Sequence, residues 1–366
     1  MKSKDLDQDL IDQVNSAIAH KTPLVIVGGN SKTFYGNRVT GEIISTAGHT
    51  GITEYQPSEL VVTVRSGTLL SELEAELKAN KQMLAFEPPQ HSEKTTIGGI
   101  IACGMSGPRR MATGSARDFI LGTTIINGKA EKCRFGGQVM KNVAGYDAAR
   151  LMVAAQGTLG VLLDISIKVL PIPESSISIK VETELQPAIK SLRQWLRQGL
   201  PISASCHYQD NLYLRLSSTP SAVKQSLTVI KNQYSSEQMD ESFWSGIKNQ
   251  THEFFTGNND GQQTDLWRFS HNDAAKLLAH SGGAPSDQLF EWHGTLCWTR
   301  TGKEQHTLAE QHQGNATRYT LHQAEPKAGN DIFQPLQPGL LKIHQRLKQA
   351  FDPDNILNPG RLYTTL

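Results

Sequence analysis

The chain has 366 residues, of which 38% are apolar and 19% charged, so its composition is that of a globular protein with two to three domains. Because 36 Lys and Arg residues balance 35 Asp and Glu residues, nucleic acid is not a favoured partner. The four cysteines form no Cys-x-x-Cys pair, which excludes an iron–sulfur cluster held by this chain's own thiolates. The apolar runs are too short to span a bilayer, and the acidic N-terminus argues against an export signal.

The first half of the chain predicts alternating helices and strands. Helical spacing of apolar residues predicts helices over 5–20, 69–79 and 146–155. β-Branched and apolar runs predict strands over 24–27, 59–64 and 161–170. The runs 119–127 and 131–135 flank Gly128, a turn residue, and predict a hairpin.

Two prolines, Pro171 and Pro173, mark the clearest domain boundary, because proline fits neither a sheet ladder nor a helix interior. Beyond them, strands are predicted over 176–181, 212–216 and 266–269, and helices over 186–197 and 221–234. A last amphipathic helix, 340–351, precedes a turn-rich tail. The sequence therefore predicts an α+β protein divided into a domain over 1–173, a second over 174–332 and a final segment over 333–366.

Three glycine-rich loops carry the strongest functional signal. Glycine adopts positive φ and lets a phosphate or a ring approach the main chain closely. The first loop consists of Gly28, Gly29, Asn30, Ser31 and Lys32. The second contains Thr96, Ile97, Gly98, Gly99, Ala102, Ser106 and Gly107, and the third contains Gly157, Leu159, Gly160 and Val161. Their order predicts a chain laid along a long dinucleotide, although each loop alone could be a tight turn or a helix cap.

This order of motifs resembles the FAD-binding domain of the vanillyl-alcohol oxidase/PCMH family. The resemblance rests on the first loop, on Thr96–Gly99, on Gly157–Gly160 and on the C-terminal stretch Asp352–Gly360. It implies an FAD-binding domain of two α/β subdomains, an α+β cap domain and a C-terminal segment that returns to the FAD domain. The strings FGGQVMKNVAGYD, WRFS and LNPGRLY are similar to one subfamily, the E subunits of bacterial glycolate oxidases.

The resemblance also implies roles for individual residues. The first loop would hold the FAD pyrophosphate, the second would approach the isoalloxazine and ribityl chain, and the third would line the flavin or its adenine end. Lys141, Asn142 and Asn358 are further expected contacts. Covalent attachment in this family often uses a His in the first loop, and this loop has none, so noncovalent FAD is expected.

Oxidation of a 2-hydroxy acid needs a cation for the carboxylate, a base, and the flavin as hydride acceptor. Arg268 and Arg361 are the candidate catalytic cations. An ion pair within the cap is the alternative for Arg268. Related catalytic dehydrogenases carry an Arg where Ser270 stands, and a metal site that includes a Glu-His dipeptide, which this sequence lacks. No metal is therefore expected.

The resemblance implies an FAD-binding subunit of a complex that oxidises glycolate to glyoxylate, with electrons passing to an iron–sulfur subunit and quinone. A second FAD subunit would complete the complex. Two alternatives stay open: a self-sufficient FAD-dependent D-2-hydroxy-acid dehydrogenase, and a non-catalytic assembly subunit with the same fold. The expected location is the cytoplasm, with peripheral attachment at the inner face of the membrane left open.

Overall fold

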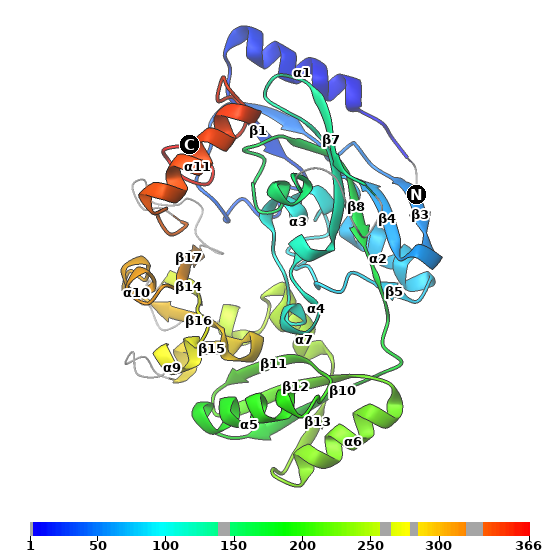
Figure 1. The fold of residues 1–366 in the computed structure, drawn as a ribbon, viewed down its shortest axis with the longest axis vertical. Coiled ribbons are helices and arrows are strands. Elements are labelled where there is room, and N and C mark those ends of the chain that lie inside the picture. The colour runs from blue at the N-terminus through cyan, green and yellow to red at the C-terminus, as the bar shows by residue number, and fades with distance from the viewer. Residues whose placement is uncertain (1–2, 138–146, 257–264, 279–284, 320–331) are drawn as a thin grey trace. The chain divides into compact units, whose positions relative to one another are not determined.

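The computed structural model describes residues 3–137, 147–256, 265–278, 285–319 and 332–366, and the chain divides into two compact units (Figure 1). Unit 1 comprises Met1–Met105, Ser115–Pro171 and His322–Leu366. Unit 2 comprises Ser106–Gly114 and Ile172–Leu321. The division after Pro171 falls at the first of the two prolines, while the nine-residue stretch 106–114 leaves the first half of the chain to join unit 2.

The first layer of unit 1 is a helix packed on a parallel strand pair. Helix α1 (Asp7–His20) is followed by β1 (Leu24–Val27), which pairs in parallel with β2 (Glu42–Ser45). The apolar stripe of α1 has Leu10, Val14 and Ala17 almost fully buried, as the 3.6-residue period requires. These side chains share one core with Leu24, Ile44, Ile126, Val161, Leu163, Ile356 and Leu357.

The second layer of unit 1 is a five-stranded antiparallel sheet in the order β3-β4-β8-β6-β7. Its strands are β3 (Ile52–Gln56), β4 (Val61–Arg65), β6 (Ile120–Ile126), β7 (Lys132–Gly136) and β8 (Val161–Lys168). Helices α2 (Leu70–Ala79) and α3 (Ile97–Cys103) bury their apolar residues in the core that this sheet forms. A short separate pair is formed by β5 (Gln82–Met83) and β9 (Leu170–Pro171). The hairpin predicted around Gly128 is confirmed by the β6–β7 pairing.

Unit 2 is built on an antiparallel eight-stranded sheet, ordered β13-β10-β12-β11-β15-β16-β14-β17. The strands are β10 (Ser175–Glu182), β11 (Ile202–Tyr208), β12 (Asn211–Ser218), β13 (Glu237–Met239), β14 (Asp265–Ser270), β15 (Gln288–Glu291), β16 (Leu296–Thr301) and β17 (Asn315–Tyr319). Helices α5 (Leu185–Arg197) and α6 (Pro220–Lys231) pack on β10–β12 (Figure 1). Trp195 of α5 is fully buried in the core that they share. The remaining helices are α4 (Arg110–Thr113), α7 (Ser242–Asn249), α8 (Glu253–Thr256), α9 (Ala274–Leu278) and α10 (His306–Gln311).

The C-terminal segment returns to unit 1. Helix α11 (Pro338–Phe351), red in Figure 1, places Leu347 and Phe351 against the core of the five-stranded sheet. The tail then runs beside β1, where Leu357 forms a bridge with Leu24. The predicted α+β class with a returning C-terminal segment is thereby confirmed.

The helix predicted over 146–155 is wrong within the described residues. Only a short 3-10 helix, Ala149–Met152, forms there, and Ala154 and Gln156 adopt positive φ of 68° and 49°. The amides of these two residues donate to the carbonyls of Ile101 and Ala102 in α3 instead of closing helical turns. Tertiary hydrogen bonds therefore override a local helical pattern.

Candidate functional site

The first two glycine-rich loops lie against each other in unit 1. A Cβ added at Gly28 would stand 2.4 Å from the Thr96 hydroxyl, and one at Gly29 would stand 1.4 Å from the Lys94 carbonyl oxygen. The Thr95 hydroxyl donates to the Ser31 hydroxyl at 3.1 Å. Both glycines are therefore required by the close approach of the two loops, whatever ligand they hold.

The first loop presents free backbone donors. Within the described part of the chain, the amides of residues 29–33 donate to no other protein group. Asn30 adopts the left-handed conformation, with a φ of 55°. Successive unpaired amides around a left-handed residue form a concave site that binds anions.

Lys32 adds a buried positive charge to this loop. Its residue is only 7% exposed, and Nζ has a single polar contact among the described residues, the Ser31 hydroxyl at 3.3 Å. No carboxylate of the described chain pairs with it. Burial lowers the pKa of Lys32, an effect that Cys103 partly opposes. A buried ammonium without a counter-ion is costly, so the arrangement calls for an anionic ligand.

The charge of Lys32 affects the pKa values of two neighbouring residues, His91 and Cys103. Burial and, to a smaller extent, the charge of Lys32 together lower the pKa of His91 to about 4. Burial raises the pKa of the Cys103 thiol, which Lys32 and Arg361 oppose. His91 Nε2 is buried and has no hydrogen-bond partner within the described residues. The electrostatic potential around the first loop is therefore positive. His91 was not among the residues predicted from the sequence.

The rest of the second loop is placed by its own packing. The Thr96 hydroxyl caps α3 by accepting the Gly99 amide at 3.3 Å, while Ile97 is 1% exposed in the core. A Cβ at Gly98 would meet the Ser66 side chain at 2.6 Å. These contacts explain the residue types structurally. The predicted flavin contacts of this loop, Ala102 included, stay predictions.

The third loop lies beside β1 and the C-terminal tail. A Cβ at Gly157 would stand 2.8 Å from the Asn358 side-chain nitrogen and 3.1 Å from Ile26. Asn358 accepts the Ile26 amide at 2.8 Å and donates to the Gln156 carbonyl at 2.6 Å. Asn358 thus ties β1 to the third loop.

The residues in the C-terminal half of the third loop are buried in the protein core. Val161 is 0% exposed in the core, Leu159 is 9% exposed, and Gly160 packs against Ile125. Packing accounts for these three residues, and their predicted cofactor contacts stay predictions.

A buried ion pair holds the tail in place. Lys348 Nζ lies 2.6 Å from Asp352 and donates to the carbonyls of Thr158, at 3.0 Å, and Leu357, at 2.7 Å. Asp352 in turn accepts the amides of Ile356 and Leu357 at 3.1 and 2.8 Å. The aspartate of the C-terminal motif therefore shapes the turn that delivers Asn358 to the third loop.

Arg361, a predicted carboxylate anchor, uses its guanidinium on the protein itself. It donates to the Gln156 side-chain oxygen at 3.0 Å and to the carbonyls of Tyr35 and Asn37 at 2.9 and 2.8 Å. Longer contacts reach the carbonyls of Lys32, Thr33 and Gly36. All three nitrogens of this guanidinium already donate to protein oxygens, and the predicted catalytic role stays a prediction.

Arg268, the other candidate cation, lies in unit 2 on β14. Its guanidinium lies 4.8 Å from the ring centre of Trp292 and 5.9 Å from that of Trp298, and it has no ion pair among the described residues. The ion pair of this strand is made instead by Asp265, whose carboxylate lies 2.7 Å from Arg318. Arg268 therefore keeps its donors for another group, as a carboxylate anchor requires.

Ser106 and Gly107 also belong to unit 2. The Trp292 indole donates to the Gly107 carbonyl at 3.1 Å, and Arg110 lies 4.5 Å from the same ring. Their predicted flavin contacts stay predictions. Lys141 and Asn142 lie outside the described residues.

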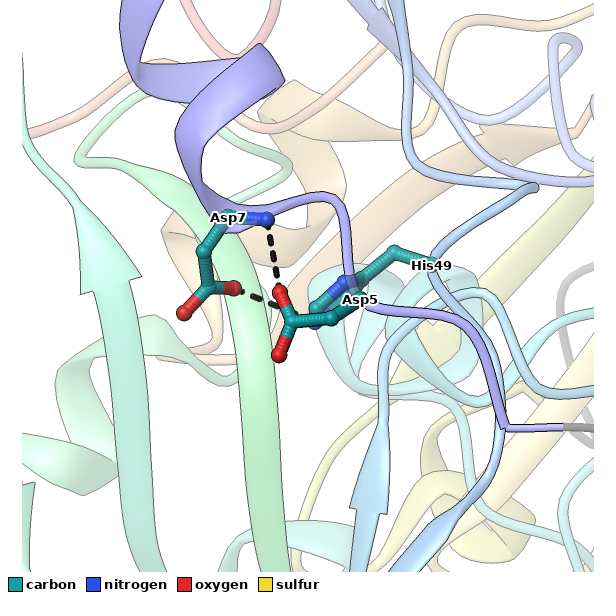
Figure 2. A group of neighbouring side chains, drawn as sticks. All are labelled: Asp5, Asp7 and His49. Carbon is teal, nitrogen blue, oxygen red and sulfur yellow. Dashed lines mark hydrogen bonds and ion pairs between the residues drawn. The ribbon is translucent and has the colours of Figure 1, made fainter.

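Asp5, Asp7 and His49 form a separate cluster at the N-terminus (Figure 2). His49 Nδ1 accepts the Leu6 amide at 3.1 Å, so neutral His49 carries its proton on Nε2, which lies 3.5 Å from Asp7. Asp5 is paired with Arg65, and Asp7 also with Lys132. Because both carboxylates already have cationic partners, the cluster is better explained as an anchor for the N-terminal segment than as a metal site.

Comparisons with known proteins identify the chain as an FAD-linked oxidoreductase. An FAD binding domain model matches residues 6–136, and a model of the C-terminal domain of FAD linked oxidases matches residues 334–362. The glycolate oxidase subunit GlcE of Escherichia coli K12 is 43% identical over the full length of both chains. A D-lactate dehydrogenase of Anaerostipes hadrus is 32% identical, over 44% of this chain and 34% of its own.

The fold has relatives among solved structures. Substrate-bound p-cresol methylhydroxylase superposes with a TM-score of 0.72 at 14% identity, covering 100% of this chain and 89% of the other. The chain belongs to the family of FAD-linked oxidases that contains glycolate oxidase subunit GlcE. FAD is the cofactor of this family, as predicted. No helix in the described part of the chain is long and apolar enough to cross a membrane.

Proposed function

We propose that the first loop holds the pyrophosphate of FAD. The observation that carries this proposal is buried Lys32, which has no carboxylate partner in the described chain and stands on the loop of unpaired amides 29–33. A pyrophosphate would supply both the missing counter-charge and the missing acceptors. When bound, FAD would supply the hydride acceptor for the oxidation of an alcohol.

We further propose that the chain is the FAD-binding subunit of a glycolate oxidase complex, which oxidises glycolate to glyoxylate. The full-length identity with GlcE supports this reading. Oxidation removes a hydride and the hydroxyl proton from glycolate, and the electrons must then leave the chain. Since its four cysteines form no cluster-binding motif, an iron–sulfur subunit and a second FAD subunit are the proposed partners, with quinone as the acceptor.

Within this proposal, Arg268 holds the substrate carboxylate. Its guanidinium lies over the faces of two tryptophans and has no ion pair among the described residues, so its planar fork stays available for a carboxylate. Arg361 is not needed for this role.

A self-sufficient D-2-hydroxy-acid dehydrogenase is the second candidate, and the similarity to a D-lactate dehydrogenase favours it. Against it stands Ser270, whose hydroxyl donates to the Asn315 carbonyl at 3.4 Å at the position where catalytic relatives carry an Arg. A non-catalytic assembly subunit is the third candidate.

A dye-linked assay with glycolate and D-lactate separates these candidates. It should be run on the purified chain alone and on the chain co-purified with its partner subunits. We expect turnover of glycolate by the complex and little or none by the isolated chain, because Ser270 replaces the Arg that related catalytic dehydrogenases carry at this position. Turnover by the isolated chain near ~10 per second, a typical enzyme value, would contradict the subunit reading and establish a self-sufficient enzyme. Unchanged turnover of a complex whose copy of this chain carries Arg268→Met would contradict the role of Arg268.

A further inference from the structure

The guanidinium of Arg361 donates hydrogen bonds to several main-chain carbonyls at the end of the first loop and directly after it. Its shortest contacts are to the carbonyls of Asn37 and Tyr35, at 2.8 and 2.9 Å. It also reaches the carbonyls of Lys32 and Thr33, both at 3.3 Å, and that of Gly36 at 3.4 Å. A single side chain from the tail, more than 320 residues away in sequence, thus contacts five main-chain carbonyls: those of Lys32, Thr33, Tyr35, Gly36 and Asn37.

The direction of these carbonyls fixes the direction of the loop's amides. In a trans peptide the C=O of one residue and the N–H of the next point in opposite directions. Because the Lys32 carbonyl faces Arg361, the amide of Thr33 faces away from it. That amide is one of the unpaired donors of the loop. Arg361 therefore holds the free Thr33 amide so that it faces away from the guanidinium.

The surrounding residues are shaped to receive this guanidinium. Gly36 has a φ of 124°, and a Cβ there would lie 2.6 Å from Arg361 Nε and 2.3 Å from the Gln156 side-chain oxygen. Gln156 accepts from Nε at 3.0 Å and is itself buried. Gly36 and Gln156 thus form a socket that fixes the plane of the guanidinium, so its geometry is specified from both sides.

We propose that Arg361 is a positioning residue for anion binding at the first loop. It acts through the loop carbonyls and does not touch the ligand. The proposal rests on the proposed binding of the FAD pyrophosphate and deepens it. Lysine cannot replace arginine in this role, because an ammonium cannot offer five donors in one plane to six acceptors.

The test measures ligand affinity of the apo-chain, with FAD and ADP as separate probes. ADP carries the pyrophosphate without the flavin, so it reports on the anion site alone. In Arg361→Lys the positive charge is kept and only the fork is lost. We expect at least a tenfold loss of affinity for both FAD and ADP.

A matched control separates positioning from simple tethering of the tail. Asn37 donates through its side chain to the Gly360 carbonyl at 3.0 Å, so Asn37→Ala loosens the same loop from the same tail but leaves the guanidinium intact. We expect Asn37→Ala to lower the melting temperature of the apo-chain and to keep its affinity within about twofold.

The outcomes distinguish the two proposals. If the unaltered apo-chain binds neither FAD nor ADP, the proposed function fails and this inference fails with it. If it binds both, and folded Arg361→Lys binds them within about twofold of it, only the positioning role is overturned. Equal losses in Arg361→Lys and Asn37→Ala would also overturn it, since tethering would then explain both. If Arg361→Lys does not fold, Gly36→Ala, which displaces the guanidinium, decides by the same criterion.

Discussion

At the scale of single residues, Lys32 carries two opposing contributions to free energy. Its buried ammonium has no carboxylate partner among the described residues, which costs stability in the apo-chain. The same charge is available to an anionic cofactor, where a hydrogen bond to a charged group contributes about 1.5–3 kcal/mol. Stability of the apo-chain and affinity for FAD should therefore respond to this residue with opposite signs.

Replacing Lys32 by Met tests this directly. We expect FAD affinity to fall by roughly tenfold to a hundredfold, while the apo-chain melts at the same or a higher temperature. Lys94→Met is the matched control, because Lys94 is exposed on the adjacent loop and should change neither quantity. A fall in both stability and affinity for Lys32→Met would show that Lys32 supports the fold and not the ligand.

His91 predicts the acid sensitivity of unit 1. Burial lowers its pKa from the ordinary 6.5 to about 4, so the folded chain favours neutral His91 while the unfolded chain binds the proton more readily. Its contribution is therefore present above pH 6.5 and lost as the pH falls towards 4, by about 3 kcal/mol at most. His91→Gln should flatten the fall of melting temperature between these pH values. An unchanged pH profile would show that His91 is accessible to protons in the folded chain.

At the scale of elements, close packing between the first and second loops explains why a glycine stands at position 29. At Gly29, the nearest obstacle to an added side chain lies in the protein itself, at the Lys94 carbonyl. Even one methyl group would have to push the second loop away. By contrast, Gly339 in the first turn of α11 has nothing within 4 Å of an added Cβ.

These two glycines make a matched pair for mutation. Gly29→Ala should destabilise the chain by about 1–3 kcal/mol, as overpacking does, and should weaken FAD binding. Gly339→Ala should stabilise it by about 0.5 kcal/mol, because alanine favours a helix. Chemical denaturation of both variants measures the difference. A neutral Gly29→Ala would contradict the close contact between the first and second loops.

Sequence patterns predicted α1 and the β6–β7 hairpin correctly. In both, the spacing of apolar residues or the turn residue in the sequence is sufficient to indicate the element. The patterns failed at 146–155, where amides bond to α3, a partner that no local pattern reveals. The roles of Gly36, Gln156 and Arg361 could not be predicted either, because they also depend on tertiary contacts. These three residues are far apart in sequence, and their function appears only when the tail meets the first loop.

At the scale of the whole molecule, the order of glycine-rich motifs predicted the family and the cofactor, and both are confirmed. The returning tail was predicted as well, because its motif resembled that of the family. The joining of 106–114 to unit 2 could not be predicted, since only tertiary contacts such as that of Trp292 with Gly107 define it.

The central claim, noncovalent FAD on a chain that serves a complex, is tested most directly by the flavin content of the purified chain. Its absorption spectrum should show oxidised flavin at about one per chain after incubation with FAD, and acid precipitation should leave the yellow colour in the supernatant. Yellow colour retained in the pellet would contradict noncovalent binding. A chain that stays colourless after incubation with excess FAD would contradict the account as a whole.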